Sequence, residues 1–99
     1  MFDFLALEWR LIHTYDPDSM VRCADLDDGA VLSFEFNVAK MDLGLDSCVS
    51  LGIRYKGRHF DTQSTADWPE FDRRFGRENW QTYLERSREH YLAYYSDDE

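Results

Sequence analysis

The spacing of apolar residues changes once along this chain, at about Ser64, and this change limits the folds that the chain can adopt. Before Ser64, apolar residues alternate with polar ones, which is the period of half-buried strands. After it they recur at spacings of three, four and seven, which is the period of amphipathic helices. Strands followed by helices predict an α+β fold, with an antiparallel sheet of four to five strands covered by C-terminal helices.

Five segments before Ser64 are predicted to be strands. Residues 30–38 alternate most clearly between apolar and polar side chains. From Leu5 to His13 every second side chain is large and mostly apolar, so we expect this face to pack on the core. Turn residues such as Pro17 and Gly29 separate the segments. The predicted strands are residues 4–14, 20–25, 30–38, 47–56 and 58–62.

The first predicted helix has a marked start and end. Asp67 stands at the N-cap position, Pro69 in the first turn and Glu70 where it would complete a capping box. Gly76 is expected to end this helix, because glycine readily adopts the backbone conformation found after a helix. The second helix carries an aromatic stripe that includes Trp80 and is expected to cover the sheet. The predicted helices are residues 68–75 and 78–95.

The chain has 99 residues, which favours a single domain over residues 1–99. A chain of this size has little room for both a core and a deep cleft, so an enzyme is disfavoured. No stretch approaches the roughly 20 apolar residues of a membrane-spanning helix, and the start of the chain lacks the features of a signal peptide. Cys23 and Cys48 do not suggest a disulfide-rich scaffold, so we expect reduced thiols and a cytoplasmic protein.

Negative charge is concentrated in the first half of the chain. The net charge is −9, and residues 1–50 contain ten Asp and Glu against three Lys and Arg. Most of these carboxylates fall in predicted loops, where they would attract a basic partner and repel nucleic acid. In a meander, alternate loops open at the same end of the sheet. One end would present the predicted partner-binding residues Tyr15, Asp16, Asp18, Asp42 and Asp46, and the other end the secondary set Asp25, Asp27 and Asp28.

Other chemistry is less well supported by the sequence. The acidic turn before Gly29 has a passing likeness to a calcium loop, but the acid that should follow it, Glu35, falls in a predicted strand. The histidines and cysteines lack the spacing of zinc ligands, so no metal and no cofactor are expected. Cys48 and His59 would give a small enzyme if they met in space. Arginines of the predicted helices alternate with acids, which favours a salt-bridged face over direct nucleic-acid binding.

Size, acidity and expected fold together favour an interaction protein. In these properties the chain resembles small inhibitors of bacteria and phages, namely immunity proteins that neutralise a toxin and phage anti-defence proteins such as anti-CRISPR proteins. The resemblance implies an inhibitor that mimics nucleic acid and occludes the groove of a basic, nucleic-acid-acting protein. The alternatives are a structural or assembly subunit, which would form homo-oligomers through an edge strand and the C-terminal helix, and the small enzyme with Cys48 and His59.

Overall fold

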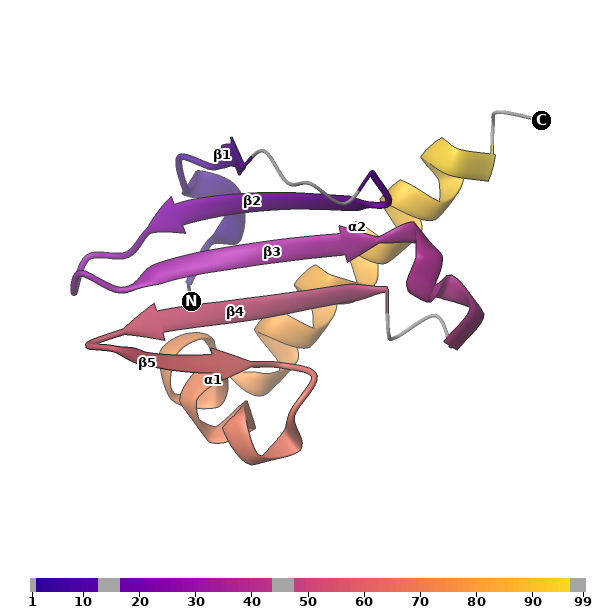
Figure 1. Cartoon of the computed structure of the whole chain (residues 1–99). Helices are drawn as coiled ribbons and strands as arrows, with labels where there is room; N and C mark the ends of the chain where they lie inside the picture. Colours follow the sequence, from indigo (N-terminus) through magenta and orange to yellow (C-terminus); the bar gives the residue numbers. More distant parts are fainter. Residues whose placement is uncertain (1, 13–16, 44–47, 97–99) are drawn as a thin grey trace.

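The computed structural model describes residues 2–12, 17–43 and 48–96. In these residues, five strands are followed by two α-helices, and short 3₁₀-helices stand between some of the elements (Figure 1). The elements in chain order are η1 (Phe4–Ala6), β1 (Arg10–Ile12), β2 (Ser19–Asp25), β3 (Val31–Asn37), η2 (Val38–Leu43), β4 (Val49–Tyr55), β5 (Arg58–Asp61), η4 (Thr65–Asp67), α1 (Trp68–Phe75) and α2 (Arg77–Ser96).

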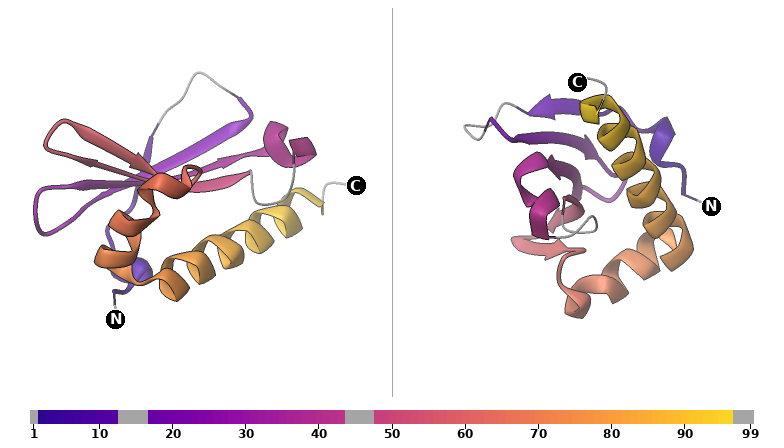
Figure 2. Two further views of the ribbon diagram at one scale, coloured as in Figure 1. Left: turned by 90° about the horizontal axis from the view of Figure 1, so that it is seen from below. Right: turned by 90° about the vertical axis from the view of Figure 1, so that its right-hand side faces the viewer.

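The strands form one antiparallel sheet in the order β1-β2-β3-β4-β5, so each strand pairs with its neighbour in sequence. β3 lies at the centre, where Phe34 is opposite Arg22 on β2 and Leu51 on β4. Both α-helices lie on the same side of the sheet (Figure 2). The predicted α+β fold, with helices covering one face of an antiparallel sheet, is confirmed.

Two hairpin turns depend on backbone with positive φ. Lys56 and Gly57 have φ values of +50° and +78°, and two such residues in a row are typical of a tight type I′ turn. Gly29 has a φ of +90° in the turn between β2 and β3, where the Leu26 N–H donates to the Ala30 carbonyl (2.8 Å). Turn geometry fixes the strand register, and the register puts the apolar side chains of the strands on the same face.

Apolar side chains of β3 and β4 form the centre of the core. Leu32, Phe34 and Phe36 alternate along β3 and are buried, as are Leu51 and Ile53 on β4. The helices cover this layer with the buried side chains Phe71, Phe75 and Trp80 and the partly buried side chains Trp68, Tyr83, Leu84 and Tyr91. Burying one such large apolar side chain contributes about 1.5–3 kcal/mol, so this layer is a main source of stability.

The N-terminal segment differs from the strand predicted for residues 4–14. Phe4–Ala6 form a 3₁₀-helix, and within the described residues only Arg10–Ile12 pair with β2. Asp3 caps this short helix, because its carboxylate accepts a hydrogen bond from the Leu5 N–H (3.0 Å). Leu5 and Leu11 are 84% and 72% exposed. The expectation that these two side chains pack on the core was therefore wrong.

Phe4 explains this difference. Its ring is buried and stacks on Tyr83 of α2, with 4.5 Å between ring centroids. The Trp9 indole N–H donates to the Phe4 carbonyl (2.9 Å), and the Asn79 side chain donates to the Phe2 carbonyl (2.7 Å). These contacts hold the segment against α2, so it cannot extend along the sheet from its first residues.

The bounds of α1 agree with the prediction, and Gly76, with a φ of +85°, separates it from α2. The predicted capping bonds were wrong. The Asp67 carboxylate makes no capping bond and instead accepts a hydrogen bond from the Asp61 N–H (3.0 Å). Glu70 pairs with arginines one turn further along α1. Asp67 therefore connects the start of α1 to β5, and Glu70 forms ion pairs within α1. Both negative charges still interact favourably with the helix dipole at this end.

We predict that Trp80→Ala lowers the free energy of unfolding by about 3 to 5 kcal/mol. The Trp80 side chain is 2% exposed and packs on the rings of Trp68 and Phe71, with centroid distances of 5.4 and 5.9 Å. Its indole N–H also donates to the Asp72 carboxylate (2.9 Å). Urea denaturation measures the change, and the exposed neighbour Gln81→Ala serves as a control that should shift stability by less than about 0.5 kcal/mol. A nearly unchanged midpoint for Trp80→Ala would contradict this packing.

Candidate functional site

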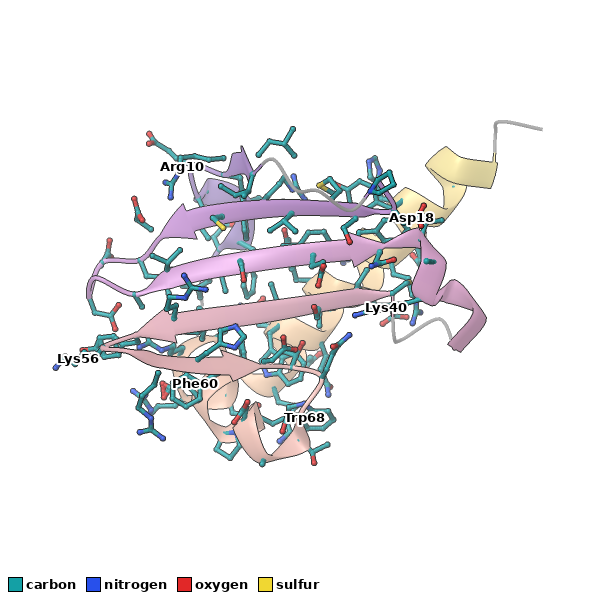
Figure 3. The ribbon with its side chains drawn as sticks, in the orientation of Figure 1. Arg10, Asp18, Lys40, Lys56, Phe60 and Trp68 are labelled. Carbon is teal, nitrogen blue, oxygen red and sulfur yellow. The ribbon has the colours of Figure 1, made fainter. Side chains whose placement is uncertain are left out.

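The acidic end of the sheet, defined here as the loop that contains Asp18 together with η2, is the site predicted from the sequence. The start of β2 and the end of β3 meet there, since the Val38 N–H donates to the Asp18 carbonyl (2.9 Å). Asp18 is exposed. Asp18 and Lys40 lie at the same end of the sheet, and Lys56 lies at the opposite end (Figure 3). The meander therefore brings the described parts of the two predicted acidic loops to one end.

Only part of the predicted site falls within the described residues. Tyr15, Asp16 and Asp46 lie outside them. Asp42 belongs to η2, but its side chain is also outside what is described. The grouping of the four carboxylates therefore stays a prediction, whereas the adjacency of the Asp18 loop and η2 is observed.

Polar contacts fix the start of η2 beside β2. The Asn37 side-chain amide donates to the Ser19 hydroxyl oxygen (2.9 Å), and that hydroxyl donates to the Glu35 carboxylate (3.4 Å). The side-chain oxygen of Asn37 accepts a hydrogen bond from the Ala39 N–H (3.0 Å). Asn37 is buried, so these bonds satisfy its polar atoms and hold the base of the loop. A loop base held in this way reduces the entropy lost when the loop binds a partner.

The acidic turn between β2 and β3 is paired with basic residues of the same chain. Asp25 accepts a hydrogen bond from Arg10 (3.2 Å), and Asp28 accepts one from Arg74 (2.8 Å). The Ala30 N–H donates to Asp28 as well (3.1 Å), and this bond, followed by the Arg74 pairing, lowers the Asp28 pKa. The charge imbalance within residues 1–50 contains no information on the pairing of Asp28, because its partner lies in the second half of the chain. Arg74 comes from α1, far away in sequence.

Arg74 connects the acidic turn, α1 and β4. Its Nε atom lies 3.2 Å from the Glu70 carboxylate, and its guanidinium carbon lies 5.0 Å from the centre of the Tyr55 ring. The Arg74 side chain is only 10% exposed and the Glu70 side chain only 13%. Burial by itself would raise the Glu70 pKa, but the hydrogen bonds from Arg73 and Arg74 outweigh it and hold that pKa below its usual value. These arginines of α1 belong to a salt-bridged helix face, which the sequence favoured.

The structure separates the residues of the catalytic alternative. His59 is opposite Arg54 on β4, whereas Cys48 precedes the first residue of that strand. The His59 Nε2 atom lies beside Gly52, four residues from Cys48, so the separation along β4 is roughly 13 Å at about 3.3 Å per residue. A nucleophile and its base need hydrogen-bond contact, so this pair does not form a site within one chain. Cys23 and Cys48 are free thiols, and no cluster of His, Cys, Asp or Glu in the described residues is suited to hold a metal ion.

Sequence reasoning missed Arg22, a cation on the inner face of the sheet. Arg22 alternates with Met20 and Ala24 along β2, so its side chain is on the apolar face that the helices cover. A cleft of about 520 Å³ opens beside it, between the N-terminal segment and α2. A charged residue at an inward position of an alternating strand is uncommon, and this pattern was the signal that could have identified it.

Comparisons with protein-family models, with curated proteins and with solved structures found no match for this chain. In the described residues, no helix is both long enough and apolar enough to cross a membrane. Function is therefore inferred from the geometry and charge of the chain itself.

We predict that the stability of the fold decreases as the pH falls below about 4.5. The pKa values of Glu70, Asp28 and Asp72 are lowered from ordinary values of 4.5, 3.8 and 3.8. A carboxyl group with a lowered pKa stabilises the fold above its unfolded-state pKa, and this contribution is lost as the pH falls through the folded-state value. Melting temperatures measured from about pH 7 to pH 2.5 should therefore decline on the acid side.

Glu70→Gln tests the largest expected share of this decline, because Glu70 is the least exposed of the three acids. The variant should melt at a lower temperature than the wild type at pH 7, and the difference should shrink toward pH 3. Glu85→Gln, on an exposed position of α2, is the matched control and should leave the profile unchanged. A constant difference between Glu70→Gln and the wild type across this range would contradict the assignment.

Proposed function

We propose that the protein is a noncatalytic inhibitor that binds a basic, nucleic-acid-acting protein and occludes its groove, as an immunity protein or a phage anti-defence protein does. The observation that carries this proposal is the meeting of the Asp18 loop and η2 at one end of the sheet, in a chain with a net charge of −9. A surface of this sign attracts a basic groove, competes with nucleic acid for it and accelerates association.

The two ends of the sheet differ in their charge balance. In the sequence, residues 13–18 and 38–48 contain four Asp and one Lys. At the opposite end, Asp25 and Asp28 are paired with arginines, and Lys56 and Arg58 flank the neighbouring turn. The acidic end therefore supports docking of a basic partner better than the opposite end does.

Two further observations support other parts of the proposal. The separation of Cys48 from His59 supports a noncatalytic role. The two free thiols are typical of a reducing compartment, which supports action in the cytoplasm.

One observation favours the assembly subunit as a second candidate function. The edge strand β1 exposes Leu11 and Ile12, and Leu5 of the preceding 3₁₀-helix is exposed as well. Edge strands with exposed apolar side chains can pair with a second chain. Light scattering on purified protein distinguishes the two candidates, because the inhibitor is expected to be a monomer until it meets its partner.

Charge reversal at the two ends of the sheet tests the inhibitor proposal. Asp18→Lys combined with Asp42→Lys changes the acidic end, and Asp25→Lys combined with Asp27→Lys changes the opposite end. Each pair raises the net charge by four, from −9 to −5, so total charge is matched. The wild-type protein should capture a basic protein from an extract of its source cell in a simple ratio, and association should slow as salt rises.

The acidic-end pair should weaken this complex at least tenfold, whereas the opposite pair should change it less than about threefold, because salt at physiological strength screens charges beyond roughly 8 Å. Circular dichroism confirms that both variants are folded. Equal losses would show that total charge, and not the acidic end, determines binding. Loss with the opposite pair alone would exclude docking through the acidic end.

A further inference from the structure

Arg22 is a cation that lies against aromatic rings of the core. Its guanidinium carbon is 5.3 Å from the centre of the Phe34 ring, 5.6 Å from that of Trp9 and 5.9 Å from that of Tyr91. Its Nε atom is buried and has no hydrogen-bond partner among the described residues. Within the described part of the chain, no carboxylate forms an ion pair with it.

This environment differs from that of Arg74, which is only 10% exposed. Arg74 is paired with two carboxylates, Glu70 and Asp28. Aromatic rings replace part of the hydration of a guanidinium group, but they are poor substitutes for the oxygen acceptors that its N–H groups require. Buried charges in proteins are usually paired. Arg22 therefore has an unmet capacity to bind an anion.

The cleft beside Arg22 has walls that are held in place. One wall is the N-terminal segment, which is fixed by the hydrogen bonds from Trp9 to the Phe4 carbonyl and from Asn79 to the Phe2 carbonyl. The other wall is α2, which lies beside that segment (Figure 2). The volume of about 520 Å³ is in the range of about 300–1,000 Å³ that small-molecule sites occupy.

The charge of this cleft is opposite to that of the whole protein. The cations Arg22 and Arg86 line it. Asp3 is the acidic side chain among its described lining residues, and the Asp3 carboxylate is engaged by the Leu5 N–H. Positively charged groups and aromatic faces therefore meet in one concave site.

We propose that this cleft binds a small aryl carboxylate, with the carboxylate paired to Arg22 and the flat apolar body packed on the aromatic walls. Guanidinium and carboxylate groups match in geometry and form charge-assisted hydrogen bonds. The rings of Trp9, Tyr83 and Tyr91 supply apolar surface for the body of the ligand. This binding is separate from the proposed docking of a protein partner at the acidic end.

Indole-3-acetate is the test ligand, and indole-3-acetamide is its neutral match in shape. The probes are added to isotope-labelled full-length protein, and the resonance of the Trp9 indole N–H is followed by NMR. Indole-3-acetate should shift this resonance in a saturable way, the amide should bind at least tenfold more weakly, and inorganic phosphate should leave the resonance unchanged. Equal affinity for acid and amide, binding of phosphate alone, or no saturable shift would overturn the proposal.

Arg22→Met removes the charge and keeps a long apolar side chain. It should weaken indole-3-acetate binding at least tenfold and leave the melting temperature close to that of the wild type, because no carboxylate of the described residues pairs with Arg22 and the methionine side chain still packs on the rings. Arg54→Met, on the uncovered face of the sheet, is the matched control and should bind as the wild type does. Arg86→Gln changes an exposed residue of the cleft and should weaken binding severalfold. If Arg22→Met does not fold, Arg86→Gln is the deciding variant. Unchanged indole-3-acetate binding in the deciding variant would overturn the proposal.

Discussion

The apolar face of β3 and β4 must be covered for the sheet to exist in water, and the rest of the structure follows from how it is covered. Phe34 and Leu51 are opposite each other at the centre of this face and are fully buried. α2 has 20 residues and is therefore about 30 Å long, long enough to cross the sheet. Gly76 turns the chain between α1 and α2, so both helices can lie on the same face. The N-terminal segment packs against α2, and this packing leaves the cleft beside Arg22.

The elements that sequence periodicity predicted well are those whose burial is decided by neighbours on the same strand or helix. β2 to β5 and both helices have bounds within two residues of the predictions, and Trp80 is buried as expected. The prediction for residues 4–14 failed because Phe4 packs on Tyr83, a partner from the other end of the chain. The capping bond predicted for Asp67 failed for a similar reason, because its carboxylate accepts a hydrogen bond from the backbone of β5 and not from that of α1. Periodicity contains no information about such partners.

The same distinction applies to the candidate site. Loop positions follow from strand order, so the adjacency of the Asp18 loop and η2 was predictable from a meander. The pairing of Asp28 with Arg74 was not, because it depends on where α1 lies against the sheet. The strand period of the sequence places Arg22 at an inward position. The cleft beside it could not be predicted in the same way, because α2 and the N-terminal segment form it together. A sequence can therefore indicate that an inward cation needs a partner without indicating whether the fold supplies one.

Strand β2 connects two regions of opposite charge, and their spacing decides whether they can act separately. Asp18 precedes the strand and Arg22 is four residues further on, which is roughly 13 Å at about 3.3 Å per residue. Salt at physiological strength screens charges over about 8 Å, so the charge at the acidic end has little effect at the cleft through solvent. The aromatic rings around Arg22 exclude water on its inner side, and a bound carboxylate would therefore interact with Arg22 more strongly than with the distant acids. A chain with a net charge of −9 can thus attract a basic partner at one end and still present a local site for a small anion.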